Sequence, residues 1–270
     1  MDARLEKRVE QVANDDSHGA SWLAVEAVEA VREAVELGED PISLGRELVA
    51  SRPALGAIAG ALGRVLASGR SDEQVLEEAR AMVESRVRAA RAIAVLLGSH
   101  IEGVVLTHSN SGTVREALIH TPPERVVCTT SEPGGEGRDL AERLREEGFA
   151  VDIVDDSDAE HAVQTVSVLL VGADTVFHDG SLVNKVGTAG LAKTAQEAGV
   201  PVLVACEVIK LTPAEPKDPG EERFDLTPPE HVDRYFTEEG DFAPDEIGAL
   251  IDRTPFLRNG YELLLESSSN

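Results

Sequence analysis

The chain has 270 residues, of which 42% are hydrophobic and 3% aromatic, so it can bury a core built mainly from aliphatic side chains. It carries 50 acidic and 25 basic residues, which gives a formal charge of −25 at neutral pH. This excess argues against binding to nucleic acid or to an anionic membrane, because both need clustered Lys and Arg.

The acidic residues are spread through every segment, whereas lysine occurs only five times. An acidic surface for a basic partner is one interpretation. We favour adaptation to concentrated salt, where the Debye length is about 3 Å at 1 M and self-repulsion is screened. The start of the chain has no apolar signal core and no run of about 20 apolar residues occurs, so we expect a cytoplasmic protein. Cys128 and Cys206 lie in apolar runs and are expected to be buried thiols.

Residues 1–98 are predicted to form a helical domain. Leu5, Val9 and Val12 recur at helical spacing near the start of the chain. A longer helical pattern runs over 72–97, and the Ser71-x-x-Gln74 spacing before it predicts a capping box at its start.

Residues 99–270 are predicted to form an α/β domain. Five short β-branched runs alternate with helical patterns, namely GVVLTH, RVVCTT, AVDIVDD, VSVLLVGAD and VPVLVAC. Such alternation indicates a parallel sheet covered on both faces, with the functional site at the carboxyl ends of its strands. The Pro-rich, charged segment Thr212–Glu230 is expected to be a long loop.

Small polar residues follow the first of these strands. A phosphate or sugar cradle is one interpretation, and a simple helix cap by Ser111 or Thr113 is the other. The candidates are His108, Ser109, Asn110, Ser111 and Gly112. Of these, His108 is more typical of a packed strand-end residue than of a catalytic base.

The block from Gly172 to Lys210 contains the most informative group. Asp174 ends a strand and could act as an acid or base, or cap a helix. Lys185 offers a charge for phosphate, Asn184 could bond a sugar hydroxyl, and the helix after Gly187 could offer free N–H groups. The alternative for Asn184 and Lys185 is a solvated turn.

Arg52 precedes Pro53, which we expect in the first turn of a helix. An arginine there can clamp a phosphate, although a surface arginine is an equally good interpretation. The sequence has no motif for NAD, ATP or zinc, so we expect neither a cofactor nor a metal.

In order, the segments SRPALG, VVLTHSNSGTV, SEPGGEGRDLAERL, GADTVFHDGSLVNKVGT and FDLTPPEHVDRYFTEEGDFAP resemble the initiation factor 2B alpha/beta/delta family. That family includes regulatory subunits of a translation exchange factor and isomerases acting on methylthioribose 1-phosphate and ribose 1,5-bisphosphate. The resemblance implies a helical N-terminal domain (1–98), a Rossmann-like C-terminal domain (99–270) and a homo-oligomer, either a dimer or a hexamer.

Two departures from the family pattern bear on catalysis. The resemblance implies a catalytic Cys where this chain has Ser109, and Asp174 as the second catalytic group. It also implies a phosphate-binding Arg where this chain has Glu132, which would repel a phosphate.

We therefore expect a protein of this family that binds a phosphorylated sugar or nucleotide without the isomerase cysteine. The alternative is a ribose 1,5-bisphosphate isomerase that uses Asp174 with Ser109 or His108. A third possibility is a translation-factor subunit with initiation factor 2 as its partner.

Overall fold

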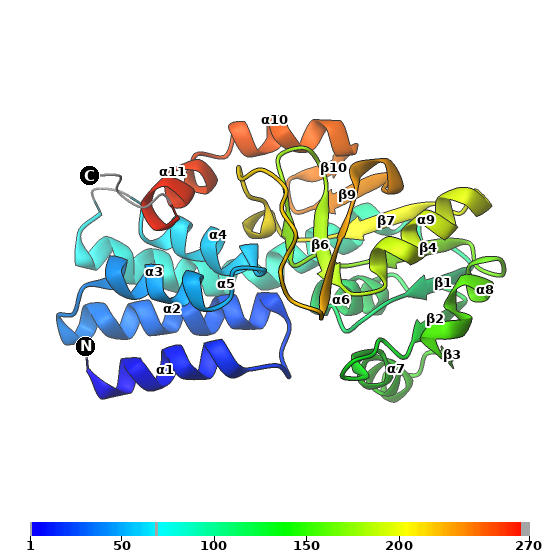
Figure 1. Ribbon diagram of the computed structural model, residues 1–270, viewed down its shortest axis with the longest axis horizontal. Helices are drawn as coiled ribbons and strands as arrows, with labels where there is room; N and C mark the ends of the chain where they lie inside the picture. Colours follow the sequence, from blue (N-terminus) through cyan, green and yellow to red (C-terminus); the bar gives the residue numbers. More distant parts are fainter. Residues whose placement is uncertain (1, 68–69, 266–270) are drawn as a thin grey trace.

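The computed structural model describes residues 2–67 and 70–265. The chain forms a helical layer beside a mostly parallel sheet, which confirms the predicted α/β class (Figure 1). The N-terminal helices are α1 (Ala3–Asn14), α2 (Ala20–Leu37), α3 (Pro41–Ser51), α4 (Gly56–Val65) and α5 (Asp72–Leu97).

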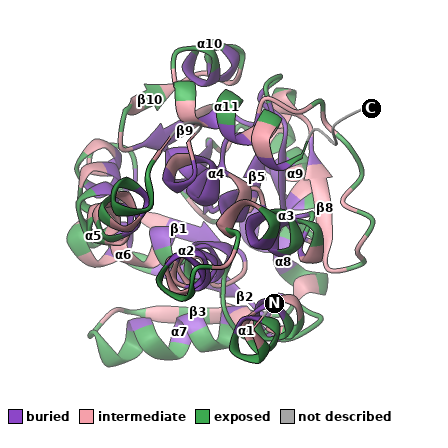
Figure 2. Cartoon of the chain, turned by 90° about the vertical axis from the view of Figure 1, so that its left-hand side faces the viewer, coloured by how far each residue is buried: buried purple, intermediate pink, exposed green. Residues whose placement is uncertain are grey.

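These helices form because their apolar residues share one face. Leu5, Val9 and Val12 of α1 are all buried, as their spacing predicted. The predicted capping box of α5 is confirmed: the Gln74 N–H donates to Ser71 Oγ and the Ser71 N–H donates to Gln74 Oε1. Figure 2 shows α4 buried among its neighbours, while the outer faces of α1, α5 and α7 are largely exposed.

A helix from the C-terminal part of the chain completes the helical layer. This helix is α11 (Pro255–Leu264), which packs on α3 and α4. A Cβ built on Gly63 would lie 2.6 Å from the Gly260 Cα atom, so the two helices cross in close backbone contact. The division at residue 98 remains a prediction, since α11 adds to the core of the N-terminal helices.

The main sheet has seven strands in the order β10-β9-β7-β4-β1-β2-β3. The five predicted strands are confirmed as β1 (Val104–Thr107), β2 (Arg125–Thr129), β3 (Val151–Val154), β4 (Val168–Val171) and β7 (Val202–Ala205). Adjacent strands among these five pair in parallel, and the chain adds β2 and β3 on one side of β1 but β4 on the other. The strand order thus reverses between β1 and β4, which is where parallel α/β sheets form a crevice.

The remaining elements cover or extend this sheet. The helices are α6 (Gly112–His120), α7 (Glu136–Glu146), α8 (Ala159–Val163), α9 (Thr188–Ala198) and α10 (Ile247–Asp252). The strand β9 (Arg234–Thr237) is parallel to β7, and β10 (Gly240–Phe242) is antiparallel to β9. Cys128 and Cys206 are buried free thiols as expected, and burial raises the pKa of each to about 12.

A small antiparallel sheet lies beside the main one and was not predicted. It consists of β5 (Thr175–Val176), β6 (Leu182–Lys185) and β8 (Phe224–Thr227). The prediction that Thr212–Glu230 is entirely loop is therefore wrong at its end, because β8 pairs with β6. This pairing places Lys185 opposite Phe224 and Asn184 opposite Asp225, so it fixes the two candidate residues on a strand.

Within residues 2–67 and 70–265, no helix combines the length and the apolar character needed to cross a membrane.

Candidate functional site

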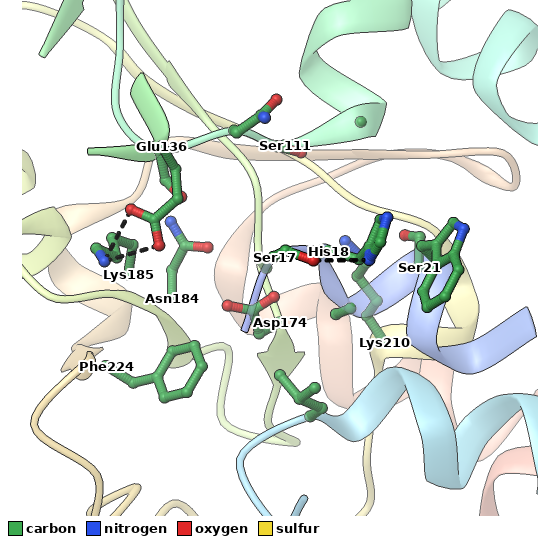
Figure 3. Close-up of a pocket in the computed structure, with 18 of the residues that line it drawn as sticks. Ser17, His18, Ser21, Ser111, Glu136, Asp174, Asn184, Lys185, Lys210 and Phe224 are labelled. Atoms are coloured by element: carbon green, nitrogen blue, oxygen red, sulfur yellow. Dashed lines mark hydrogen bonds and ion pairs between the residues drawn. The ribbon is translucent and has the colours of Figure 1, made fainter. Parts of the chain in front are cut away.

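A cavity of about 340 Å³ opens at the carboxyl ends of β1 and β4, where the strand order reverses. Its other walls come from the α1–α2 connection, the start of α2, β6 and the segment before β8 (Figure 3). Among the described lining residues, three are acidic and seven are basic, namely Arg52, Arg86, Arg115, Arg143, Lys185, Lys210 and Arg223. The cavity thus reverses the charge balance of a strongly acidic chain.

The loop after β1 forms one wall of the cavity. Ser109, Asn110, Ser111 and Gly112 all line it. Ser109 has a positive φ of 69°, and its N–H donates to Ser131 Oγ at 2.7 Å. Ser111 Oγ accepts from the Val114 N–H at 3.3 Å, so this hydroxyl also caps α6.

His108 lies behind this loop rather than in the cavity lining. Its Nε2 lies 2.9 Å from the Val186 carbonyl oxygen, so Nε2 carries the proton. Its Nδ1 then accepts from the Thr129 hydroxyl at 2.6 Å, and Thr129 Oγ1 accepts from Ser131 Oγ at 2.8 Å. His108 is thus a packed, hydrogen-bonded residue at the end of its strand. The chain of hydrogen bonds from His108 through Thr129 and Ser131 ends at the Ser109 N–H, which donates to Ser131 Oγ.

Burial lowers the pKa of His108, so the folded protein binds this proton less readily than the unfolded chain. We expect the free energy of unfolding to decrease as the pH falls below about 6.5, the usual histidine pKa. Between pH 7.5 and 5.5 the wild type should lose about 1 kcal/mol more than His108→Gln, in urea denaturation at each pH. Equal losses in the two proteins would contradict this assignment.

Asp174 follows β4 and points into the cavity near Asn184 and Lys210 (Figure 3). Burial raises the pKa of Asp174, while the positive charges of Lys210 and Arg52 oppose the shift. Its backbone N–H donates to the Val183 carbonyl at 2.9 Å, which ties the end of β4 to β6. A carboxyl group with a raised pKa can donate a proton as well as accept one.

Asn184 and Lys185 line the cavity from β6, and both are buried. The Asn184 amide donates to Thr188 Oγ1 at 3.1 Å. Lys185 Nζ donates to Glu136 Oε1 at 2.9 Å and to the Pro133 carbonyl. The expected alternative, a solvated turn, is therefore wrong for this pair.

Gly187 is not part of the cavity lining. The N–H groups of Gly187 and Ala189 at the start of α9 both donate to Asp225 Oδ2, at 2.8 and 3.2 Å. The N–H groups that we expected to be free for a ligand anion are thus already bound to a carboxylate of the chain itself.

Arg52 lines the cavity, but its local setting differs from the prediction. It follows the last residue of α3, and Pro53 lies in the turn before α4 rather than in a helix. The Arg52 side chain is buried, and its Nε has no hydrogen-bond partner among the described residues.

Glu132 lies outside the cavity lining, with its side chain 53% exposed and paired with Arg138. The repulsion expected from a carboxylate at this position therefore does not arise from Glu132. Glu136, at the start of α7, is the acid that faces the cavity from this segment.

The family model "Initiation factor 2 subunit family" matches residues 16–223, which is more than half of the chain. The chain belongs to this family. It is 34% identical to a ribose 1,5-bisphosphate isomerase of Haloferax volcanii over 54% of this chain and 55% of that protein. It is 28% identical to the ribose 1,5-bisphosphate isomerase of Archaeoglobus fulgidus over 87% of this chain and 88% of that one.

A solved structure supports the same assignment to the initiation factor 2 subunit family. The crystal structure of the translation initiation factor eIF-2B from Pyrococcus horikoshii OT3 matches with a TM-score of 0.81 and 27% identity. The match covers 90% of this chain and 98% of that one.

Sequence reasoning missed several cavity residues of this family member. Lys210 drew attention only because lysine is scarce, and its place beside Asp174 required the fold. The others, among them His18, Trp22, Arg86, Arg143 and Arg223, lie in segments whose orientation no local pattern reveals.

Proposed function

We propose that this protein binds a phosphorylated sugar or nucleotide in the cavity and that binding, rather than isomerisation, is its activity. The observation that carries this proposal is Lys210. Its side chain is buried and lines the cavity, yet no described carboxylate lies within ion-pair distance of its Nζ. A buried ammonium without an acid partner is costly, and a phosphate would compensate it.

The other contacts agree with an anionic ligand of small size. The buried Arg52 side chain is one of seven basic residues that line the cavity. A volume of about 340 Å³ is at the lower end of the range typical of small-molecule sites. Hydroxyl and amide groups of Ser109, Asn110 and Asn184 supply partners for sugar hydroxyls.

A ribose 1,5-bisphosphate isomerase is the second candidate, favoured by the raised pKa of Asp174 in the cavity. After ring opening, Asp174 would act as acid and base while a proton moves from C2 to C1. Ser109 would replace the cysteine that the family resemblance implies, but a serine hydroxyl needs a base to activate it. No described residue hydrogen-bonds the Ser109 hydroxyl, so we favour binding over catalysis.

A thermal-shift panel in molar salt tests the proposal. Ribose 1,5-bisphosphate, ribose 5-phosphate and AMP are compared with unphosphorylated ribose. At a concentration 100 times its Kd, a ligand should stabilise the protein by about 2.7 kcal/mol, whereas ribose should have no effect. Stabilisation by none of the phosphorylated compounds would contradict binding.

A turnover assay separates the two candidates. We expect no conversion of ribose 1,5-bisphosphate to ribulose 1,5-bisphosphate. Enzyme-like turnover that disappears in Asp174→Asn would replace the binding proposal with the isomerase.

A further inference from the structure

The connection between α1 and α2, residues 15–19, closes one side of the cavity and is held there by two arginines. The Asp16 carboxylate lies 3.4 Å from Arg52 Nη1 and also forms an ion pair with Arg223 Nη1. Arg223 Nη2 donates to the Asp16 carbonyl at 3.2 Å, and Arg52 Nη1 donates to the Asp15 carbonyl at 3.0 Å. All three charged side chains line the cavity.

The same wall continues as a row of alternating charges. Arg223 Nη2 lies 3.6 Å from Glu136, and Glu136 pairs with Lys185 at 2.9 Å. Two carboxylates, Asp16 and Glu136, thus occupy the cations that a phosphate would use. Any anionic ligand that binds these cations must compete with a carboxylate of the chain.

Arg52 and Asp16, which form an ion pair, differ in burial. The Arg52 side chain is 9% exposed, whereas the Asp16 side chain is 66% exposed. An ion pair with a solvated carboxylate contributes little, about 0 to 1 kcal/mol, so Asp16 can leave at low cost while Arg52 stays in place. A phosphate dianion binds a pair of arginines more strongly, since it can accept bidentate, charge-assisted hydrogen bonds.

We propose that Asp16 is an internal competitor that occupies the phosphate position between Arg52 and Arg223 until a ligand replaces it. This inference rests on the proposed binding function and adds a specificity residue to it. A dianionic phosphate displaces Asp16, whereas a singly charged carboxylate ligand gains nothing over the group it would replace. Displacement also removes the carboxylate contacts of Asp16 and so loosens the hold of the two arginines on residues 15–19.

The protein carries its own reporter for this exchange. Trp22 is the single tryptophan and lines the cavity. It stacks on His18, with ring centroids 3.8 Å apart and an angle of 16°. His18 bonds to Ser17 and Asp15 in the same connection, and Figure 3 shows Ser17 and His18 beside the space that Asp174 and Lys210 face. Release of the connection therefore changes the surroundings of the indole ring.

The test is a titration of ribose 5-phosphate into the wild type, Asp16→Asn and Asp139→Asn at constant ionic strength. Calorimetry measures the affinity, and tryptophan fluorescence is recorded in parallel. Asp139 is exposed on α7 and outside the cavity lining, so its variant controls for net charge. We expect Asp16→Asn to bind about 5-fold more tightly than wild type. Its ligand-free emission should already resemble that of ligand-bound wild type, and Asp139→Asn should behave as wild type.

The possible results distinguish failure of the Asp16 inference from failure of the proposed binding function. Binding by wild type with equal or weaker affinity in Asp16→Asn overturns the role of Asp16 and leaves the binding function intact. Binding by none of the three proteins overturns the proposed function and this inference with it.

Discussion

Replacing Lys210 with methionine is expected to weaken the binding of ribose 5-phosphate about 10- to 100-fold. A hydrogen bond to a charged group is worth about 1.5 to 3 kcal/mol. The buried Lys210 ammonium forms no ion pair with a described carboxylate, so it is available to a bound phosphate. The same substitution should change the stability of the unliganded protein little, because it removes a buried charge but also the favourable interaction of that charge with Asp174.

Calorimetric titration and urea denaturation measure these two effects, with Lys193→Met as the matched control. Lys193 is a lysine of α9 whose side chain is 62% exposed, with Glu197 at 4.0 Å, so its loss should change neither quantity appreciably. A Lys210→Met variant that binds as wild type would contradict the proposed anion site. A strongly destabilised variant would show that Lys210 has a structural role instead.

Replacing Gly60 with alanine is expected to destabilise the protein by about 3 kcal/mol. Gly60 lies on α4, and a Cβ at this position would be 1.9 Å from the Ile209 carbonyl oxygen. This obstacle is backbone, so it cannot move aside as a flexible side chain would. Because Ile209 precedes Lys210, the strain should also shift the ammonium and reduce ligand affinity.

Gly190→Ala provides the control for this substitution. Gly190 is an exposed glycine inside α9, and a Cβ at this position would have no atom within 4 Å, so alanine should stabilise the helix by up to about 1 kcal/mol. Chemical denaturation of both variants gives the comparison. Similar stabilities for Gly60→Ala and Gly190→Ala would show that α4 can retreat from the 3-10 turn at Val208–Lys210.

Five of the parallel strands could be predicted because each lies in a short run rich in β-branched and apolar residues, and this signal is local. The pairing of β8 with β6 could not, since it joins residues about 40 positions apart and Phe224–Thr227 follows a Pro-rich, charged stretch. Missing β8 also affected the prediction of the site. Without β8, the role of Asp225 as the cap of α9 could not be foreseen.

The candidate site could likewise be predicted only in part from the sequence. Ser109 and Asp174 could be placed together because polar residues after the carboxyl ends of the neighbouring parallel strands β1 and β4 converge, whereas Asn184 reaches the cavity from the antiparallel strand β6. Whether a side chain faces inward could not be derived from spacing: Glu132 turns outward, whereas Glu136 turns inward. Salt adaptation, self-association and initiation factor 2 as a partner stay predictions.

The contact of α11 with α3 and α4 limits how this protein can be dissected. A fragment that ends near residue 98 would lack the helix whose Gly260 fits against Gly63, and would leave that face of α4 open to solvent. Because α11 follows the last strand of the sheet, the chain must pass through the whole sheet before the helical layer is covered. The two layers are therefore expected to unfold together in a single cooperative transition.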